Sequence, residues 1–222
     1  MFRIILILLV FPLFEVFAQT GGTTGLDALQ NYRRGRDLEA MNRLQESETY
    51  YNEAVRLCTD EISRNNATRD SYTVLTWTLQ RQKKYADVIV WGERGLRLYS
   101  DEFRIVETMG EAYFYADDYA ASQRFMQRYI NSNPQGDRVS VAYFFLGEIF
   151  RLEGKFRHAD MAYTTAVLLE PSLSLWWYRL GSVREAAGDF RPAAEAYEQA
   201  VRINPNYREA SDGLARSRRQ AG

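Results

Sequence analysis

The sequence predicts an all-α protein, a superhelical stack of antiparallel helix pairs, and three observations carry the prediction. Residues 143–147 (YFFLG) match residues 177–181 (WYRLG), and residues 154–159 (GKFRHA) match residues 188–193 (GDFRPA). Both matches are displaced by 34 residues. Apolar residues in these segments recur three or four positions apart, the spacing of one helical face. Such a period is typical of repeat arrays in which neighbouring units stack.

Each unit is expected to contain two helices. The first carries an aromatic residue and then Leu-Gly, and the second carries Ala, an aromatic residue and Ala. Because Gly147 has no side chain, we expect the partner helix to approach closely there. Gly154 stands where the first helix ends and suits a left-handed cap, while Pro171 stands where the second helix must stop. The equivalents 34 residues further on are Gly181, Gly188 and Pro205.

These residues resemble the tetratricopeptide repeat (TPR), a family whose 34-residue pattern is an aromatic, Leu-Gly, Tyr or Phe, Ala, an aromatic, Ala and Pro. Residues 140–173 and 174–207 match it nearly completely. One departure is Arg184, which stands where the family has an aromatic residue such as Phe150. The resemblance implies a TPR solenoid in which the first helix of each pair lines a concave groove.

Three earlier segments follow the pattern less closely within the expected TPR domain, residues 26–222. Residues 103–136 keep Met-Gly and the final Pro but are followed by three inserted residues, 137–139. Residues 69–102 lack the final Pro, and residues 28–61 form a degenerate first repeat. Residues 208–220 predict a mostly polar capping helix at the end of the stack.

The first eighteen residues predict a secretory signal peptide. Arg3 precedes an apolar run over residues 4–14, and small residues are spaced for cleavage before Gln19. The run is shorter than the roughly twenty residues that a spanning helix needs, so a cleaved peptide is favoured over a retained anchor. Residues 19–25 are expected to form a flexible leader. The sequence therefore predicts an exported protein, periplasmic or secreted, without a stable membrane span after cleavage.

Composition argues against several classes of function. The 28 basic and 29 acidic side chains leave no bulk charge that would favour nucleic acid. The single cysteine, Cys58, cannot form an intramolecular disulfide and is expected to fill space on a helix. Nucleophile, metal-ligand and phosphate-loop motifs are absent, so we expect no enzyme activity, no cofactor and no metal. His158 is expected to be an exposed polar residue.

The predicted function is to bind a protein or peptide partner in the concave groove, with an envelope complex among the expected settings. The groove should combine exposed aromatic residues with charges of both signs, a composition that binding hot spots favour. The predicted contact residues are Trp77, Arg81, Arg104, Glu107, Glu111, Phe114, Tyr115, Phe144, Glu148, Arg151, Tyr178 and Glu185.

Two alternative functions remain open, a carrier of a small apolar ligand and an enzyme. Some of these aromatic residues are expected to pack against an adjacent repeat instead of a partner. The aromatic set Trp77, Phe114, Phe144 and Tyr178 also suits a carrier or sensor of a small apolar ligand such as a lipid. An enzyme with catalytic carboxylates scattered over the repeats has the least support, and two acids converging in one cleft would be its signature.

Overall fold

The computed structural model describes residues 27–222, which fold into eleven α-helices joined by short turns and contain no strand. The predicted signal peptide 1–18 and leader 19–25 lie outside the described residues. The predicted all-α stack is confirmed. The helices are α1 (Ala28–Ala40), α2 (Leu44–Ser63), α3 (Arg69–Arg81), α4 (Tyr85–Leu98), α5 (Phe103–Tyr115), α6 (Tyr119–Ser132), α7 (Val139–Leu152), α8 (Phe156–Leu169), α9 (Ser174–Ala186), α10 (Phe190–Ile203) and α11 (Arg208–Ala221).

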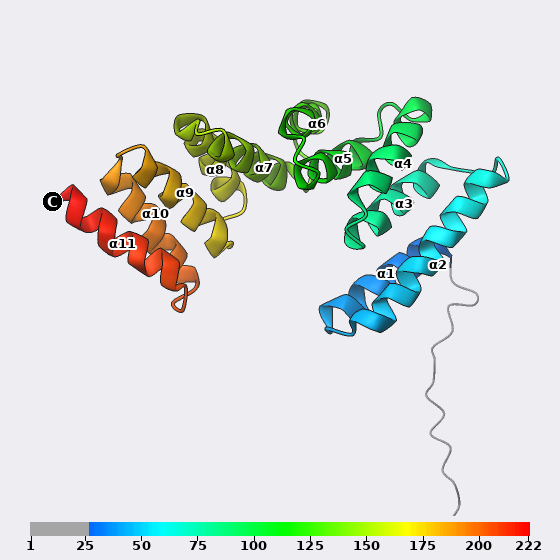
Figure 1. Cartoon of the computed structure of the whole chain (residues 1–222), viewed down its shortest axis with the longest axis horizontal. Helices are drawn as coiled ribbons and strands as arrows, with labels where there is room; N and C mark the ends of the chain where they lie inside the picture. The colour runs from blue at the N-terminus through cyan, green and yellow to red at the C-terminus, as the bar shows by residue number, and fades with distance from the viewer. Residues whose placement is uncertain (1–26) are drawn as a thin grey trace, which may run out of the picture.

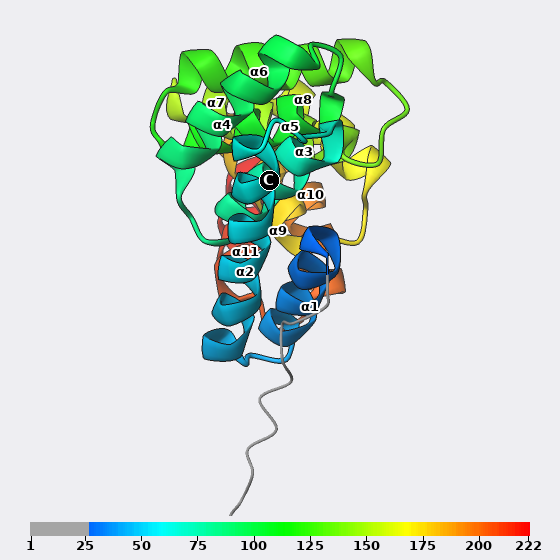
Figure 2. The same cartoon turned by 90° about the vertical axis from the view of Figure 1, so that its right-hand side faces the viewer.

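The helices follow one another along an arch (Figures 1 and 2). Helices α1 and α2 form one foot, and α9, α10 and α11 form the other. Each helix packs against the next in sequence, and odd-numbered helices also contact one another in the pairs α1–α3, α3–α5, α5–α7 and α9–α11. The first helices of successive pairs therefore form the inner layer of the arch.

A residue with left-handed backbone separates the two helices of each pair. Gly154 (φ 71°) and Gly188 (φ 82°) have this conformation, as their sequence positions predict. Asn42, Lys83 and Asp117 occupy the corresponding turns, at φ between 58° and 60°. The turn geometry is therefore kept throughout the array, although only the last two pairs place glycine there.

Small residues allow the helices to approach closely. Ala159, Ala166, Ala193 and Ala200 are fully buried between helices. Cys58 is also fully buried, and burial raises the pKa of its thiol to about 12, so it fills space in the core. These buried positions require close contact between the helices of each pair.

The departure from the repeat pattern at Arg184 has a structural counterpart. Its Nε donates to Asp160 Oδ1 at 2.7 Å and its Nη2 donates to Thr164 at 3.2 Å, which joins α9 to α8. Phe150, at the equivalent place one repeat earlier, packs against apolar core residues instead. An ion pair thus replaces an aromatic contact at the last repeat interface.

Candidate functional site

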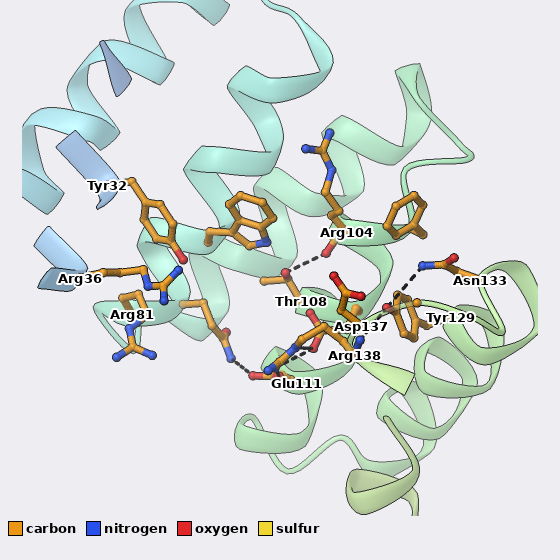
Figure 3. A pocket seen from close by; sticks show the side chains of 15 residues that line it. Tyr32, Arg36, Arg81, Arg104, Thr108, Glu111, Tyr129, Asn133, Asp137 and Arg138 are labelled. Carbon is orange, nitrogen blue, oxygen red and sulfur yellow. Dashed lines mark hydrogen bonds and ion pairs between the residues drawn. The ribbon is translucent and has the colours of Figure 1, made fainter. Parts of the chain in front are cut away.

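A cavity of about 720 Å³ lies on the concave side, between the first three helix pairs (Figure 3). Helices α1, α3 and α5 provide three of its walls, and the end of α6 with the following loop provides the fourth. Its lining residues are Tyr32, Arg36, Trp77, Gln80, Arg81, Phe103, Arg104, Glu107, Thr108, Glu111, Tyr129, Asn133, Gly136, Asp137 and Arg138. A site of this kind exists only because several repeats stack.

Aromatic rings form the wall at α1 and α3. Both helices begin at capping boxes, with Asp27 and Thr68 as the capping residues, which fixes where their first turns start. The rings of Tyr32 and Trp77 stack with centroids 5.6 Å apart. The guanidinium of Arg36 lies 5.8 Å from the centre of the Tyr32 ring. This wall offers flat apolar surface with a cation beside it.

Two arginines of the cavity are already neutralised by carboxylates. Arg81 pairs with Glu39 at 2.7 Å. Arg104 pairs with the buried Glu102 at 2.7 Å and with Asp70 at 2.9 Å. Both guanidinium groups are therefore held by nearby acids, which fixes their position at the cavity wall.

Two glutamates of α5, one helical turn apart, share one arginine. Arg138 pairs with Glu107 at 2.9 Å and also with Glu111, while Gln80 Nε2 donates to Glu111 Oε2 at 3.0 Å. Burial raises the pKa of the Glu107 carboxyl, the charge of Glu111 raises it further, and Arg138 opposes both effects. The raised pKa favours the protonated form of Glu107, so the charge of Arg138 is balanced mainly by the carboxylate of Glu111.

The three-residue insertion brings Arg138 to the cavity. After α6 ends, the Gly136 N–H donates to the Asn133 carbonyl at 2.9 Å, and the Val139 N–H donates to the Gly136 carbonyl at 3.1 Å. The Arg138 N–H donates to Tyr129 Oη at 3.3 Å. A Cβ atom at Gly136 would lie 2.5 Å from the Tyr129 hydroxyl and would also collide with the Asn133 side chain, so these side chains would have to move to accept it.

Five of the twelve predicted contact residues line this cavity: Trp77, Arg81, Arg104, Glu107 and Glu111. The other seven lie elsewhere: Phe114, Tyr115, Phe144, Glu148, Arg151, Tyr178 and Glu185. They belong to α5, α7 and α9, which continue the inner layer toward the other foot of the arch. Their role in partner binding stays a prediction.

The aromatic members of this second group pack against other rings. Phe114 meets Phe145 with centroids 5.0 Å apart, Tyr115 stacks on Tyr85 at 4.9 Å, and Phe144 stacks on Trp176 at 4.9 Å. Tyr178 lies 5.0 Å from Tyr207, the residue that caps the start of α11. Tyr115 is still 49% exposed, so it keeps surface for a partner.

The charged members of the second group are held by intramolecular bonds. Glu148 is 7% exposed, pairs with Arg151 at 2.7 Å and with Arg179 at 2.9 Å, and accepts a hydrogen bond from Tyr163. Glu185 pairs with Arg216 at 2.9 Å and accepts from Tyr197 at 2.7 Å. These carboxylates join successive repeats.

Three charged lining residues were absent from the predicted contact set: Arg36, Asp137 and Arg138. A sequence signal exists for Arg138, because its pair with Glu107 spans 31 residues, the spacing of Glu148–Arg179 and Glu185–Arg216. This spacing is about one helical turn less than the repeat period. Arg36 lies in the degenerate first repeat and Asp137 lies outside the repeat phase, so neither has a comparable signal.

The geometry defines the class of protein as an α-solenoid with a concave inner surface. The family model for the tetratricopeptide repeat matches residues 174–207. Residues 174–207 therefore match a tetratricopeptide repeat, and the described residues as a whole have the fold of a TPR solenoid. No curated protein sequence matches the chain.

Solved structures share the fold at low sequence identity. A crystal structure of MamA has a TM-score of 0.64 and 19% identity, over 78% of this chain and 95% of that chain. The crystal structure of YrrB, described as a TPR protein with an unusual peptide-binding site, has a TM-score of 0.56 and 16% identity, over 85% of this chain and 92% of that chain. At these identities the likeness concerns the fold.

The described residues also bear on membranes and metals. No helix of residues 27–222 is long and apolar enough to cross a membrane. The same part of the chain contains no group of three or more His, Cys, Asp or Glu side chains that could hold a metal ion. His158 is exposed, with its ring 5.4 Å from that of Phe150.

Proposed function

We propose that the chain is a non-enzymatic protein-interaction scaffold that binds an extended peptide or a helix in its concave groove. The observation that carries this proposal is the cavity of about 720 Å³, which three successive inner helices and the 137–139 insertion build together. Stacked rings and charges of both signs line it, a composition suited to side chains of a polypeptide. The peptide-binding site described for YrrB is compatible with this use of the fold.

An apolar ligand is less well supported than a peptide. Of the four aromatic residues that suggested such a ligand, only Trp77 lines the cavity, while Phe114, Phe144 and Tyr178 pack against other rings. Four arginines line the same space. A lipid tail would remove water from these charged groups and offer them no hydrogen bonds, which is unfavourable.

The enzyme alternative predicted two acids converging in a cleft, and Glu107 and Glu111 do converge. Both belong to α5, however, and both bind the guanidinium of Arg138. General acid and base carboxylates must flank an open space in which a substrate bond can lie. Here the arginine occupies the space between them, so the pair is better suited to shaping a binding surface.

Export is part of the same proposal. The pattern of residues 1–18 supports a cleaved signal peptide and work in the periplasm or outside the cell, in an envelope complex. Amino-terminal sequencing of the protein recovered from fractionated cells tests this. The proposal predicts an amino terminus at Gln19 in an extracytoplasmic fraction, and full-length protein in the cytoplasm would contradict it.

Site-specific photo-crosslinking in the producing cells tests the binding function. Arg36 and Arg33 are both exposed residues of α1, but only Arg36 lines the cavity. With benzoylphenylalanine at position 36, we expect crosslinks to another polypeptide, and with the same group at position 33 we expect none. Equal labelling from both positions, or none from either, would contradict binding in the cavity.

A further inference from the structure

The inserted segment 137–139 gives the cavity a wall that the repeat pattern does not provide. It contributes one cation, Arg138, which Glu107 and Glu111 already bind. It also contributes one anion, Asp137, which is exposed and forms no ion pair or hydrogen bond with any described residue. Figure 3 shows Asp137 beside Arg138, at the end of the cavity opposite Arg36. The insertion thus adds one positive charge that is already paired with carboxylates and one negative charge that is unpaired.

Oxygen acceptors outnumber donors at this end. Three carboxyl groups, those of Glu107, Glu111 and Asp137, line this end beside one guanidinium, that of Arg138, which pairs with the two glutamates. Burial and the charge of Glu111 raise the pKa of Glu107 and so favour its protonated form, and the negative charge at this end therefore lies on Glu111 and Asp137. Gln80 Nε2 donates a hydrogen bond to Glu111, whereas Gln80 Oε1 is buried without a hydrogen-bond partner among the described residues. A positively charged group with N–H donors would offset the negative charge and could also donate a hydrogen bond to Gln80 Oε1.

The other cations of the lining do not cancel this surplus, because Arg36, which forms no ion pair with a described residue, lies at the opposite end of the cavity and the other two are paired. Arg81 is paired with Glu39, and Arg104 with Glu102 and Asp70. The stacked rings of Tyr32 and Trp77 supply the apolar surface along which the methylenes of a long basic side chain can lie. The cavity therefore combines an acidic end with an aromatic wall.

We infer that the end of the cavity formed by Asp137 and Glu111 binds a lysine or arginine side chain of the peptide in the groove, and that Asp137 sets this specificity. The inference rests on the proposed peptide-binding function and adds the chemistry of the residue that is recognised. Asp137 contributes to it because its carboxylate has no partner to give up. Asp137→Asn keeps the shape of the side chain and removes only the charge.

The test uses a phage-displayed library of random dodecapeptides, selected on the purified protein, on Asp137→Asn and on Asp212→Asn. The last variant makes the same change on α11, away from the cavity. We expect selected peptides to share a Lys or Arg position on the wild type and on Asp212→Asn. On Asp137→Asn the enrichment of that position should fall about fivefold, the effect of losing one partly exposed ion pair.

The other outcomes separate the two proposals. Selected peptides without a shared basic position, peptides with a shared acidic position, or equal enrichment on Asp137→Asn would overturn the inference and leave groove binding intact. A library from which no peptide is enriched on folded wild-type protein would contradict the proposed function, and the inference with it. Circular dichroism establishes that each variant is folded before selection.

Discussion

Glycine and tyrosine meet at the same place in several helix pairs. A Cβ atom at Gly147 would lie 2.5 Å from Tyr163 Cδ1, and one at Gly181 would lie 2.7 Å from Tyr197 Cδ1. Both rings are buried. The Tyr163 hydroxyl also donates to Glu148, so the ring is held at both its face and its tip. At this scale the sequence requires glycine because a ring occupies the space of a side chain.

Gly147→Ala should therefore destabilise the fold. The added methyl group cannot be accommodated without moving the buried Tyr163 ring, and overpacking of this kind costs about 1–3 kcal/mol. Chemical denaturation followed by circular dichroism measures the loss in free energy of unfolding. Gly222→Ala is the matched control, because a Cβ there would meet only a backbone atom at 3.7 Å. Equal stability of the two variants would show that the glycine is not needed for packing.

Ion pairs across repeats connect the inner helices. Glu107–Arg138, Glu148–Arg179 and Glu185–Arg216 all span 31 residues. Tyr163 and Tyr197 of the second helices donate to two of these carboxylates. Each of these two clusters involves three helices, so it fixes how one pair is oriented on the next.

The pair at the carboxyl-terminal foot predicts a pH dependence. The hydrogen bond from Arg216 lowers the pKa of Glu185 below its ordinary value of 4.5, although burial opposes the shift. A carboxyl whose pKa is lowered on folding stabilises the protein above its unfolded pKa, and the contribution disappears as the pH falls through the folded pKa. Glu185→Gln should therefore cost about 1 kcal/mol at pH 7.

The difference between wild type and Glu185→Gln should shrink as the pH falls below about 4.5, where the carboxyl becomes protonated in the unfolded chain and then in the folded one. Denaturation midpoints at pH 7, 5 and 3.5 test this expectation. Glu195→Gln, an exposed change on α10, should have no effect at any pH. A difference that stays constant with pH would mean that the charge of Glu185 does not contribute.

The fold was predictable at the level of elements, and the site only in part. The 34-residue period and the Gly and Pro positions fix helix pairs and their turns, so the all-α stack follows from local residues. The sequence did not predict which carboxylates of the inner face are free to contact a partner. Glu148 and Glu185 are not free, because arginines of the following unit bind them. Asp137 lines the cavity from a turn that lies outside the 34-residue repeat, so the repeat pattern could not predict its position.

At the scale of the whole molecule, the cavity depends on the stacking of three consecutive pairs. Its lining residues come from α1, α3 and α5 and from the segment that joins α6 to α7. Each helix contacts mainly its neighbours, so the relative placement of these walls is set by a chain of local contacts. Binding one peptide across them would hold several repeats in one arrangement.

If this cavity holds the peptide, a bulky group that blocks the cavity should weaken binding. Cys58 is fully buried, so Arg36→Cys or Arg33→Cys introduces one accessible thiol for a bulky maleimide. Isothermal titration with a library-selected peptide compares the two labelled proteins. A label at 36 should weaken binding at least tenfold, about 1.4 kcal/mol, and a label at 33 should not. Unchanged affinity with position 36 labelled would mean that the peptide does not bind in this cavity.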